Sequence, residues 1–395
     1  MTIILLNVKL TISFYLFYGE IYIQMKYKID TNIKKPAYLQ LYEEIKKDII
    51  NGSIPYGSKL PSKRILSEET GVSVITAEHA YSLLCDEGYA ESRERSGYFS
   101  VFKPEESLLQ NDDISYYSTL DISKKEPSYT RQDFPFSVIS KAMRKILADY
   151  GEEIMIKSPN KGCMELRTAI SKYLERSRGI KASPEQIIIG SGAEYLYGLI
   201  VEMFSKNYIY GIENPSYEKI EQVYKAKGVK YEMLNLTHDG IKSSDLKNTN
   251  ASVLHITPYR SFPSGVTASA SKRREYIKWV NENTDKKRFI VEDDFESEFT
   301  LSKKPEDTLY SLSDNDNIIY LNTFSMTISP SIRTGYMVIP KSLIETFDIK
   351  LGFYSCTVPT FEQYVLTELI GSGDFERHIN RVRRKKRKSE SQNNG

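Results

Sequence analysis

From Asp133 onward, short apolar segments rich in β-branched residues alternate with stretches of helical periodicity. This alternation indicates a largely parallel α/β sheet, because parallel strands need a crossover connection that is usually a helix. Functional residues of such sheets gather in the loops that follow the strands. The six segments expected as strands are residues 186–189, 208–212, 252–256, 289–291, 318–321 and 335–339.

Residues 36–101 show a different pattern, in which three short helices precede a hairpin. Ser62 and Ser73 are suited to cap the second and third helices, and Gly71 is suited to end the second. The short turn at 70–72 therefore predicts a helix-turn-helix. Apolar residues at helical spacing predict the inward faces, which are Tyr38, Leu41, Tyr42, Ile45 and Ile49 in the first helix and Val74, Ala77, Tyr81 and Leu84 in the third.

Residues 89–92 and 98–101 are expected as two short strands joined by a turn, which together would form a wing. The third helix can enter a major groove, while basic side chains of the second helix and the wing can contact phosphates. The alternative is that the helices and the hairpin pack as an accessory domain. The residues expected to contact DNA are Lys63, Arg64, Ser73, Thr76, His79, Arg93 and Arg95.

The same segment resembles the GntR-type winged helix. The matching motifs include residues 57–66 (GSKLPSKRIL), 71–73 (GVS), 87–89 (EGY) and 96–99 (SGYF). The resemblance implies that the partner is a double-stranded DNA operator. Many family members have an arginine after the serine that starts the recognition helix, and this chain has Val74 there. The operator sequence is therefore left open.

Loops that follow the predicted strands carry residues suited to a phosphorylated ring. Backbone N–H groups at a glycine turn that opens a helix can hold a phosphate, although a tight turn is the commoner reason for such glycines. A carboxylate at a strand end can pair with a pyridinium nitrogen, although acidic residues at this place more often lie in solvent at the edge of the sheet. Hydroxyl and guanidinium groups can grip a phosphate. The candidate cofactor-binding residues are Gly192, Ala193, Tyr217, Asp293, Ser325 and Arg333.

In this order the loops resemble the fold-type I aminotransferase domain of MocR-type regulators, the GntR subfamily that is fused to such a domain. The resemblance covers about residues 25–388 and includes residues 165–167 (ELR), 178–180 (RGI) and 376–379 (ERHI). It implies an α/β fold with an N-terminal winged helix-turn-helix and a pyridoxal-phosphate-type large domain. It also implies a homodimer whose operator binding responds to a vitamin B6 or amino-acid-like effector.

The chain differs from this family at the position of the catalytic lysine. The family's Schiff-base lysine follows the serine of a Thr-Phe-Ser-Lys-Thr motif, and this chain has Met326 at that place. A thioether has no nucleophilic amine, so no Schiff base can form there. We expect no catalytic residue, and pyridoxal phosphate that is bound non-covalently or is absent. Phe295 replaces a family tyrosine, and most of the family's small domain is expected to be missing after Gly395.

Three hypotheses follow from these patterns. The first is a DNA-binding transcription regulator with a degenerate aminotransferase-like effector domain. The second is a working aminotransferase with a DNA-binding appendage, which would need a substitute lysine. The third is a truncated gene product without function.

The same patterns predict five segments of the chain. Residues 1–24 are expected to be a non-native extension, with a short membrane anchor as the alternative, because polar residues interrupt the apolar run at 3–23. Residues 25–102 are expected to be the DNA-binding domain and residues 103–132 a polar linker. Residues 133–345 would form the large domain, and residues 346–395 the start of the small domain with a basic tail.

Bulk composition restricts the remaining possibilities. The net charge is +2, so a nucleic-acid partner has to be argued from local pattern. The three cysteines (Cys85, Cys163 and Cys356) and the four histidines are scattered, without the spacing of a metal site or a disulfide framework. We therefore expect no metal and no membrane partner, and a cytoplasmic location.

Overall fold

The computed structural model describes residues 12–17, 20–25, 27–30, 33, 35–103, 134–204, 206–282, 287–300, 306–313 and 315–393. The chain divides into two compact units, Met1–Glu126 and Pro127–Gly395, and each is described by itself. Except for Lys103, the predicted linker lies outside the described residues.

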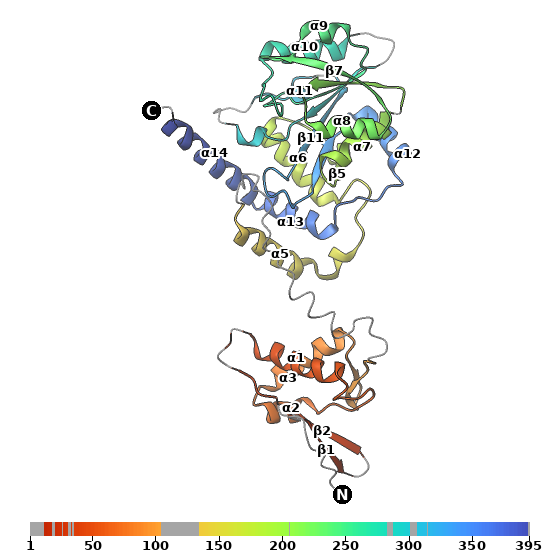
Figure 1. Ribbon diagram of the computed structural model, residues 1–395, viewed down its shortest axis with the longest axis vertical. Helices are drawn as coiled ribbons and strands as arrows, with labels where there is room; N and C mark the ends of the chain where they lie inside the picture. The colour runs from red at the N-terminus through yellow and green to blue at the C-terminus, as the bar shows by residue number, and fades with distance from the viewer. Residues whose placement is uncertain are drawn as a thin grey trace. The chain divides into compact units, whose positions relative to one another are not determined.

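The N-terminal unit contains the three expected helices, α1 (Ala37–Ile50), α2 (Lys63–Thr70) and α3 (Val74–Asp86) (Figure 1). The predicted caps are confirmed. Ser62 Oγ accepts a hydrogen bond from the Ile65 N–H at 3.3 Å, and Ser73 Oγ accepts one from the Thr76 N–H at 3.1 Å. Gly71 ends α2 in the left-handed conformation, which glycine adopts without a steric penalty.

Two antiparallel hairpins accompany these helices. The wing consists of β3 (Ala90–Arg93) and β4 (Gly97–Ser100), and Lys59 adds a bridge to Phe99. The second hairpin, β1 (Ile12–Phe17) and β2 (Glu20–Met25), lies mostly within the segment expected to be a non-native extension.

The core of the N-terminal unit is formed by the apolar stripes of the helices. Buried members are Leu41, Tyr42, Ile45, Ile49, Leu66, Ala77, Ala80, Tyr81 and Leu84. The expected inward orientation of Val74 is wrong, because this side chain is 42% exposed. Its position is one turn before the buried stripe, at the open N-terminal end of α3.

The C-terminal unit is built on an eight-stranded sheet with the order β5-β12-β11-β10-β9-β6-β7-β8. Strands β11, β10, β9, β6 and β7 are parallel, whereas β12 and β8 run antiparallel to their neighbours. The bounds are β5 (Ile187–Gly190), β6 (Ile209–Asn214), β7 (Lys230–Thr237), β8 (Gly240–Ile241), β9 (Val253–Ile256), β10 (Phe289–Asp293), β11 (Ile318–Thr323) and β12 (Gly335–Val338). All six expected strands are present, and the parallel-rich α/β fold class is confirmed.

Helices pack on both faces of this sheet (Figure 1). Successive side chains of a strand point to opposite faces, and the buried strands carry apolar side chains on both. Ile187 and Ile189 pack in the same core cluster as residues of α5, α6 and α13, whereas Ile188 packs with residues of α7, α8 and α12. The helices are α5 (Phe136–Tyr150), α6 (Met164–Arg178), α7 (Ala193–Phe204), α8 (Glu218–Ala226), α9 (Ser243–Asn248), α10 (Ala270–Asn281), α11 (Leu309–Leu312), α12 (Ile344–Leu351), α13 (Thr360–Gly371) and α14 (Asp374–Asn393). Among the described residues, none of the helices combines the length and the apolar character needed to cross a membrane.

Candidate functional site

The predicted DNA-binding residues gather on α2, α3 and the wing of the N-terminal unit. Lys63 and Arg64 occupy the first turn of α2, and Lys63 Nζ lies 2.5 Å from the Glu78 carboxylate of α3. Arg93 and Arg95 belong to the wing, where the Arg95 side chain is 92% exposed. Exposed basic groups in this arrangement can contact phosphates on either side of a helix that lies in a groove.

The polar residues of α3 have contacts within the unit. The hydroxyls of Ser73 and Thr76 lie 2.8 Å apart, and both take part in capping the helix. The His79 ring packs against Tyr38 of α1 with a centroid separation of 4.9 Å. Ser73 and His79 are still exposed, so they can also meet a partner.

In the C-terminal unit, Asp293 ends β10 and is buried beside aromatic side chains. Its Oδ2 accepts a hydrogen bond from the Tyr197 hydroxyl of α7 and lies 3.5 Å from His255 Nε2 of β9. The Tyr224 hydroxyl lies 2.7 Å from His255 Nδ1. Burial raises the pKa of Tyr197 and of Tyr224 well above the usual range, so both hydroxyls keep their protons. The Asp293 Oδ1 atom is buried and has no hydrogen-bond partner among the described residues.

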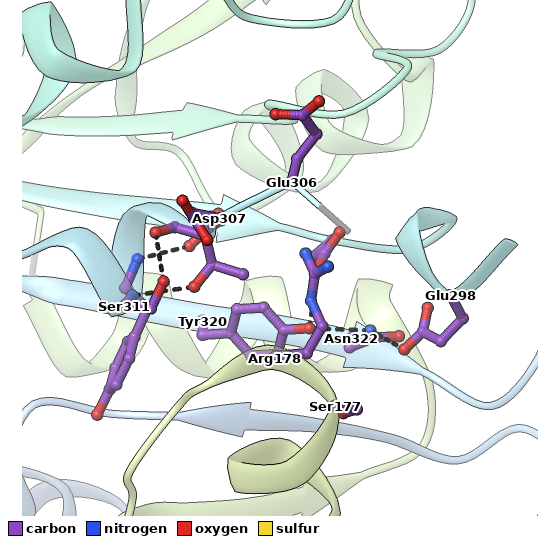
Figure 2. Close-up of polar contacts among 12 residues, drawn as sticks. Ser177, Arg178, Glu298, Glu306, Asp307, Ser311, Tyr320 and Asn322 are labelled. Carbon is purple, nitrogen blue, oxygen red and sulfur yellow. Dashed lines mark hydrogen bonds and ion pairs between the residues drawn. The ribbon is translucent and has the colours of Figure 1, made fainter. Parts of the chain in front are cut away.

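The neighbouring carboxylate, Asp294, belongs to a second buried group of polar residues. Its Oδ2 lies 2.7 Å from Arg178 Nη2 and accepts a hydrogen bond from the Tyr320 hydroxyl at 2.8 Å. Figure 2 shows Arg178, Tyr320, Asn322 and Glu298 together, and the Asn322 amide donates to Glu298 at 2.7 Å. Asp294 is therefore paired with a buried arginine, whereas Asp293 Oδ1 has no hydrogen-bond partner among the described residues.

Three buried glutamates near these aspartates were not found from the sequence. Burial raises the pKa of Glu213 to about 8, and the charge of Asp293 adds to the shift. Burial, reinforced by the charge of Asp294, raises the pKa of Glu292 and of Glu298 to about 7. Their sequence signal was weak, because an acidic residue in or after a strand is usually solvated.

The predicted phosphate-binding residues lie together at a more exposed place. Gly192 has φ 86°, and a Cβ there would lie 3.2 Å from Arg333 Nη2. Arg333 Nη2 lies 2.5 Å from the Glu194 carboxylate of α7, which is not among the residues predicted from the sequence. Ser325 Oγ donates to the Ile332 carbonyl at 3.0 Å. Ala193 begins α7 directly after Gly192.

Tyr217 and Met326 are also at the surface of the C-terminal unit. Tyr217 is 38% exposed, packs edge-on against Phe262 at 6.1 Å and contributes to the raised pKa of Tyr197. Met326 is 41% exposed in the turn after β11, directly beside Ser325.

Comparison with known proteins agrees with this division into two functional parts. Residues 37–99 match the family of bacterial regulatory proteins of the gntR family, and residues 118–392 match the aminotransferase class I and II family. The HTH-type transcriptional regulator YdeL of Bacillus subtilis is 33% identical over 89% of this chain and 77% of its own length. The probable rhizopine catabolism regulatory protein MocR of Rhizobium meliloti is 26% identical over 90% of this chain and 76% of its own length.

A regulator of pyridoxine biosynthesis and solved aminotransferases are also similar. The HTH-type regulator PdxR of Corynebacterium glutamicum is 28% identical over 87% of this chain and 75% of its own length. Kynurenine aminotransferase of Pyrococcus horikoshii has a TM-score of 0.58 at 24% identity and covers 72% of this chain and 73% of its own. The chain therefore belongs to the MocR-type subfamily of GntR transcription regulators, in which a DNA-binding winged helix is fused to an aminotransferase-like domain of fold type I.

Proposed function

We propose that the aminotransferase-like domain of this regulator binds an effector and is not an enzyme. The observation that carries the proposal is Met326, which stands where the family motif has its reactive lysine. A thioether can neither attack a carbonyl group nor hold the cofactor covalently. Its relatives YdeL, MocR and PdxR are named as regulators, which supports the same interpretation.

The ring end of the candidate site fits pyridoxal phosphate. The buried Asp293 Oδ1 has no hydrogen-bond partner among the described residues, and a protonated ring nitrogen is a donor that would satisfy it. The Tyr197 hydroxyl donates a hydrogen bond to the other oxygen and so fixes the orientation of the carboxylate, and His255 Nε2 lies 3.5 Å from that oxygen. When bound, the cofactor would supply an electron-withdrawing ring. In this proposal Tyr217 contacts the face of that ring.

The phosphate end fits less completely. Gly192 lets the Arg333 guanidinium lie close to the backbone, because a Cβ there would lie only 3.2 Å from Arg333 Nη2, and Ala193 opens a helix whose backbone N–H groups favour an anion. Ser325 can add a hydroxyl. Arg333 already forms an ion pair with Glu194, and the negative charge of this carboxylate repels a phosphate. We therefore propose weak, non-covalent binding of pyridoxal phosphate or of a related vitamin B6 or amino-acid-like ligand.

In this proposal the protein acts as a homodimer on chromosomal DNA in the cytoplasm. Residues 25–102 bind the operator, residues 103–132 connect the two parts, and residues 133–345 hold the effector. The proposed base- and phosphate-contacting residues are Lys63, Arg64, Ser73, Thr76, His79, Arg93 and Arg95. Effector binding would change the affinity for the operator by a coupling free energy between the two sites.

The proposal is tested by adding a stoichiometric amount of pyridoxal phosphate to the purified chain, reducing with borohydride and locating the modified residue by peptide mass spectrometry. The parent protein should gain no covalent mass at position 326, whereas Met326→Lys should gain one cofactor. Met326→Leu is the matched control, and it should behave like the parent. A covalent adduct in the parent at any lysine of the site would favour an aminotransferase with a DNA-binding appendage. Failure to give a folded protein would favour a non-functional product.

A further inference from the structure

The first turn of α3 carries two adjacent aliphatic side chains that point away from the core. Val74 is 42% exposed and Ile75 is 76% exposed, directly after the N-cap residue Ser73. A single exposed aliphatic residue is ordinary. This pair stands at the N-terminal end of the recognition helix of a helix-turn-helix, which is the end that contacts base edges in the major groove.

The polar side chains around this pair are bonded within the N-terminal unit. The Ser73 and Thr76 hydroxyls form a hydrogen bond of 2.8 Å, and Lys63 Nζ lies 2.5 Å from Glu78 Oε1. The His79 ring packs on α1. A base contact made by these groups would have to compete with the contacts that they already have. Val74 and Ile75 have no such contacts to lose, because they have no donor or acceptor in the side chain.

Aliphatic side chains can distinguish bases through one feature of the major groove. Thymine presents a C5-methyl group there, whereas the other base edges present donors and acceptors. An arginine at position 74 could form two hydrogen bonds with guanine, which valine cannot do. We propose that Val74 and Ile75 recognise thymine bases in each operator half-site by contact with their methyl groups. The inference rests on the DNA-binding function of the family and names its base preference.

The same unit carries exposed positive charge on α2 and on the wing, and this charge suits the phosphates of the same duplex. Arg64 lies in the first turn of α2, and Arg95 is 92% exposed in the wing. Contacts with phosphates position a protein on DNA but do not choose a sequence. The charged residues therefore supply attraction and register, and the aliphatic pair supplies selection.

The test uses the full chain and a duplex selected by it from a random DNA pool. Each thymine of the selected half-site is replaced by deoxyuridine, which removes only the methyl group and keeps the base pair. At one or more positions the replacement should weaken binding about fivefold, the size of a single lost base contact. The same replacement should have little effect on the variant Ile75→Ala or Val74→Ala, because the partner of the methyl group is already gone.

Two control variants separate this mechanism from general effects. Ile349→Ala removes an aliphatic side chain of equal exposure, 75%, from α12 of the other unit, and it should keep the full uracil penalty. Arg64→Ala should weaken binding to all sequences alike and also keep the penalty. Selective binding without any thymine sensitivity, or a penalty that persists in both alanine variants of α3, would overturn the proposal alone. Absence of selective binding would overturn the DNA-binding function together with it.

Discussion

Two arginine–carboxylate pairs of the C-terminal unit have similar lengths but very different surroundings. Arg178 and Asp294 lie 2.7 Å apart, with side chains that are 5% and 4% exposed. Arg333 and Glu194 lie 2.5 Å apart, with side chains that are 56% and 35% exposed. The buried pair cannot exchange partners without leaving a charge in the core, whereas the exposed pair can release its arginine to a ligand. The buried pair therefore belongs to the core of the unit, and the proposed function assigns the exposed pair to ligand binding.

The largest effect is expected from breaking the buried pair. Asp294→Asn should lower the free energy of unfolding by about 3–5 kcal/mol, because the buried Arg178 keeps its charge and loses the carboxylate with which it pairs. Glu194→Gln removes the equivalent carboxylate at the surface and should cost less than about 1 kcal/mol. Urea denaturation followed by the fluorescence of Trp279, the single tryptophan, reports on this unit. Equal losses in the two variants would show that exposure does not decide the outcome.

The next effect concerns pH and the buried Glu213. Its pKa is raised from 4.5 to about 8, so the folded protein keeps a proton that the unfolded chain has released. The free energy of unfolding should therefore fall as the pH rises from about 5 to 8, by up to about 1.4 kcal/mol per pH unit for this group. Glu213→Gln should remove this slope and leave the part due to Glu292 and Glu298. An unchanged slope between pH 5.5 and 7.5, measured by urea denaturation, would contradict the assignment.

A smaller effect is expected at the ring end of the site. Asp293→Asn should weaken the binding of pyridoxal phosphate about tenfold, because a charge-assisted hydrogen bond to the ring nitrogen is lost. Equilibrium dialysis measures the change. Glu202→Gln alters an exposed carboxylate that pairs with Lys227, and it should bind the ligand like the parent. Unaltered affinity in the Asp293 variant would mean that the orphaned oxygen does not face the ligand.

The smallest effect is expected at the exposed pair, where Glu194 would compete with the ligand phosphate for Arg333. Glu194→Gln frees Arg333 and removes a like charge, so the affinity for pyridoxal phosphate should rise about threefold. Pyridoxal lacks the phosphate, and its affinity should stay the same. A parallel gain for both ligands would place the effect of Glu194 elsewhere than at the phosphate.

Much of the fold could be predicted from the sequence, because the signals are local. The caps Ser62 and Ser73 lie within three residues of the N–H groups that they satisfy, and six strands were visible as short apolar runs. Strand β7 was missed since it alternates polar and apolar side chains, and only one of its residues is fully buried. The two-residue strand β8 is too short to give a pattern.

The sequence by itself determined that a thioether stands at position 326, that helix caps surround a helix-turn-helix, and that acidic residues follow a strand. It could not show that Asp294, and not Asp293, pairs with a buried arginine, or that Glu194 forms an ion pair with Arg333. Those outcomes depend on partners more than 90 residues away, such as Tyr197 for Asp293 and Arg178 for Asp294. Only the order of the strands brings these partners together. The two aspartates are equally buried, so their partners decide that Asp294 is paired with an arginine and that Asp293 has an oxygen without a hydrogen-bond partner among the described residues.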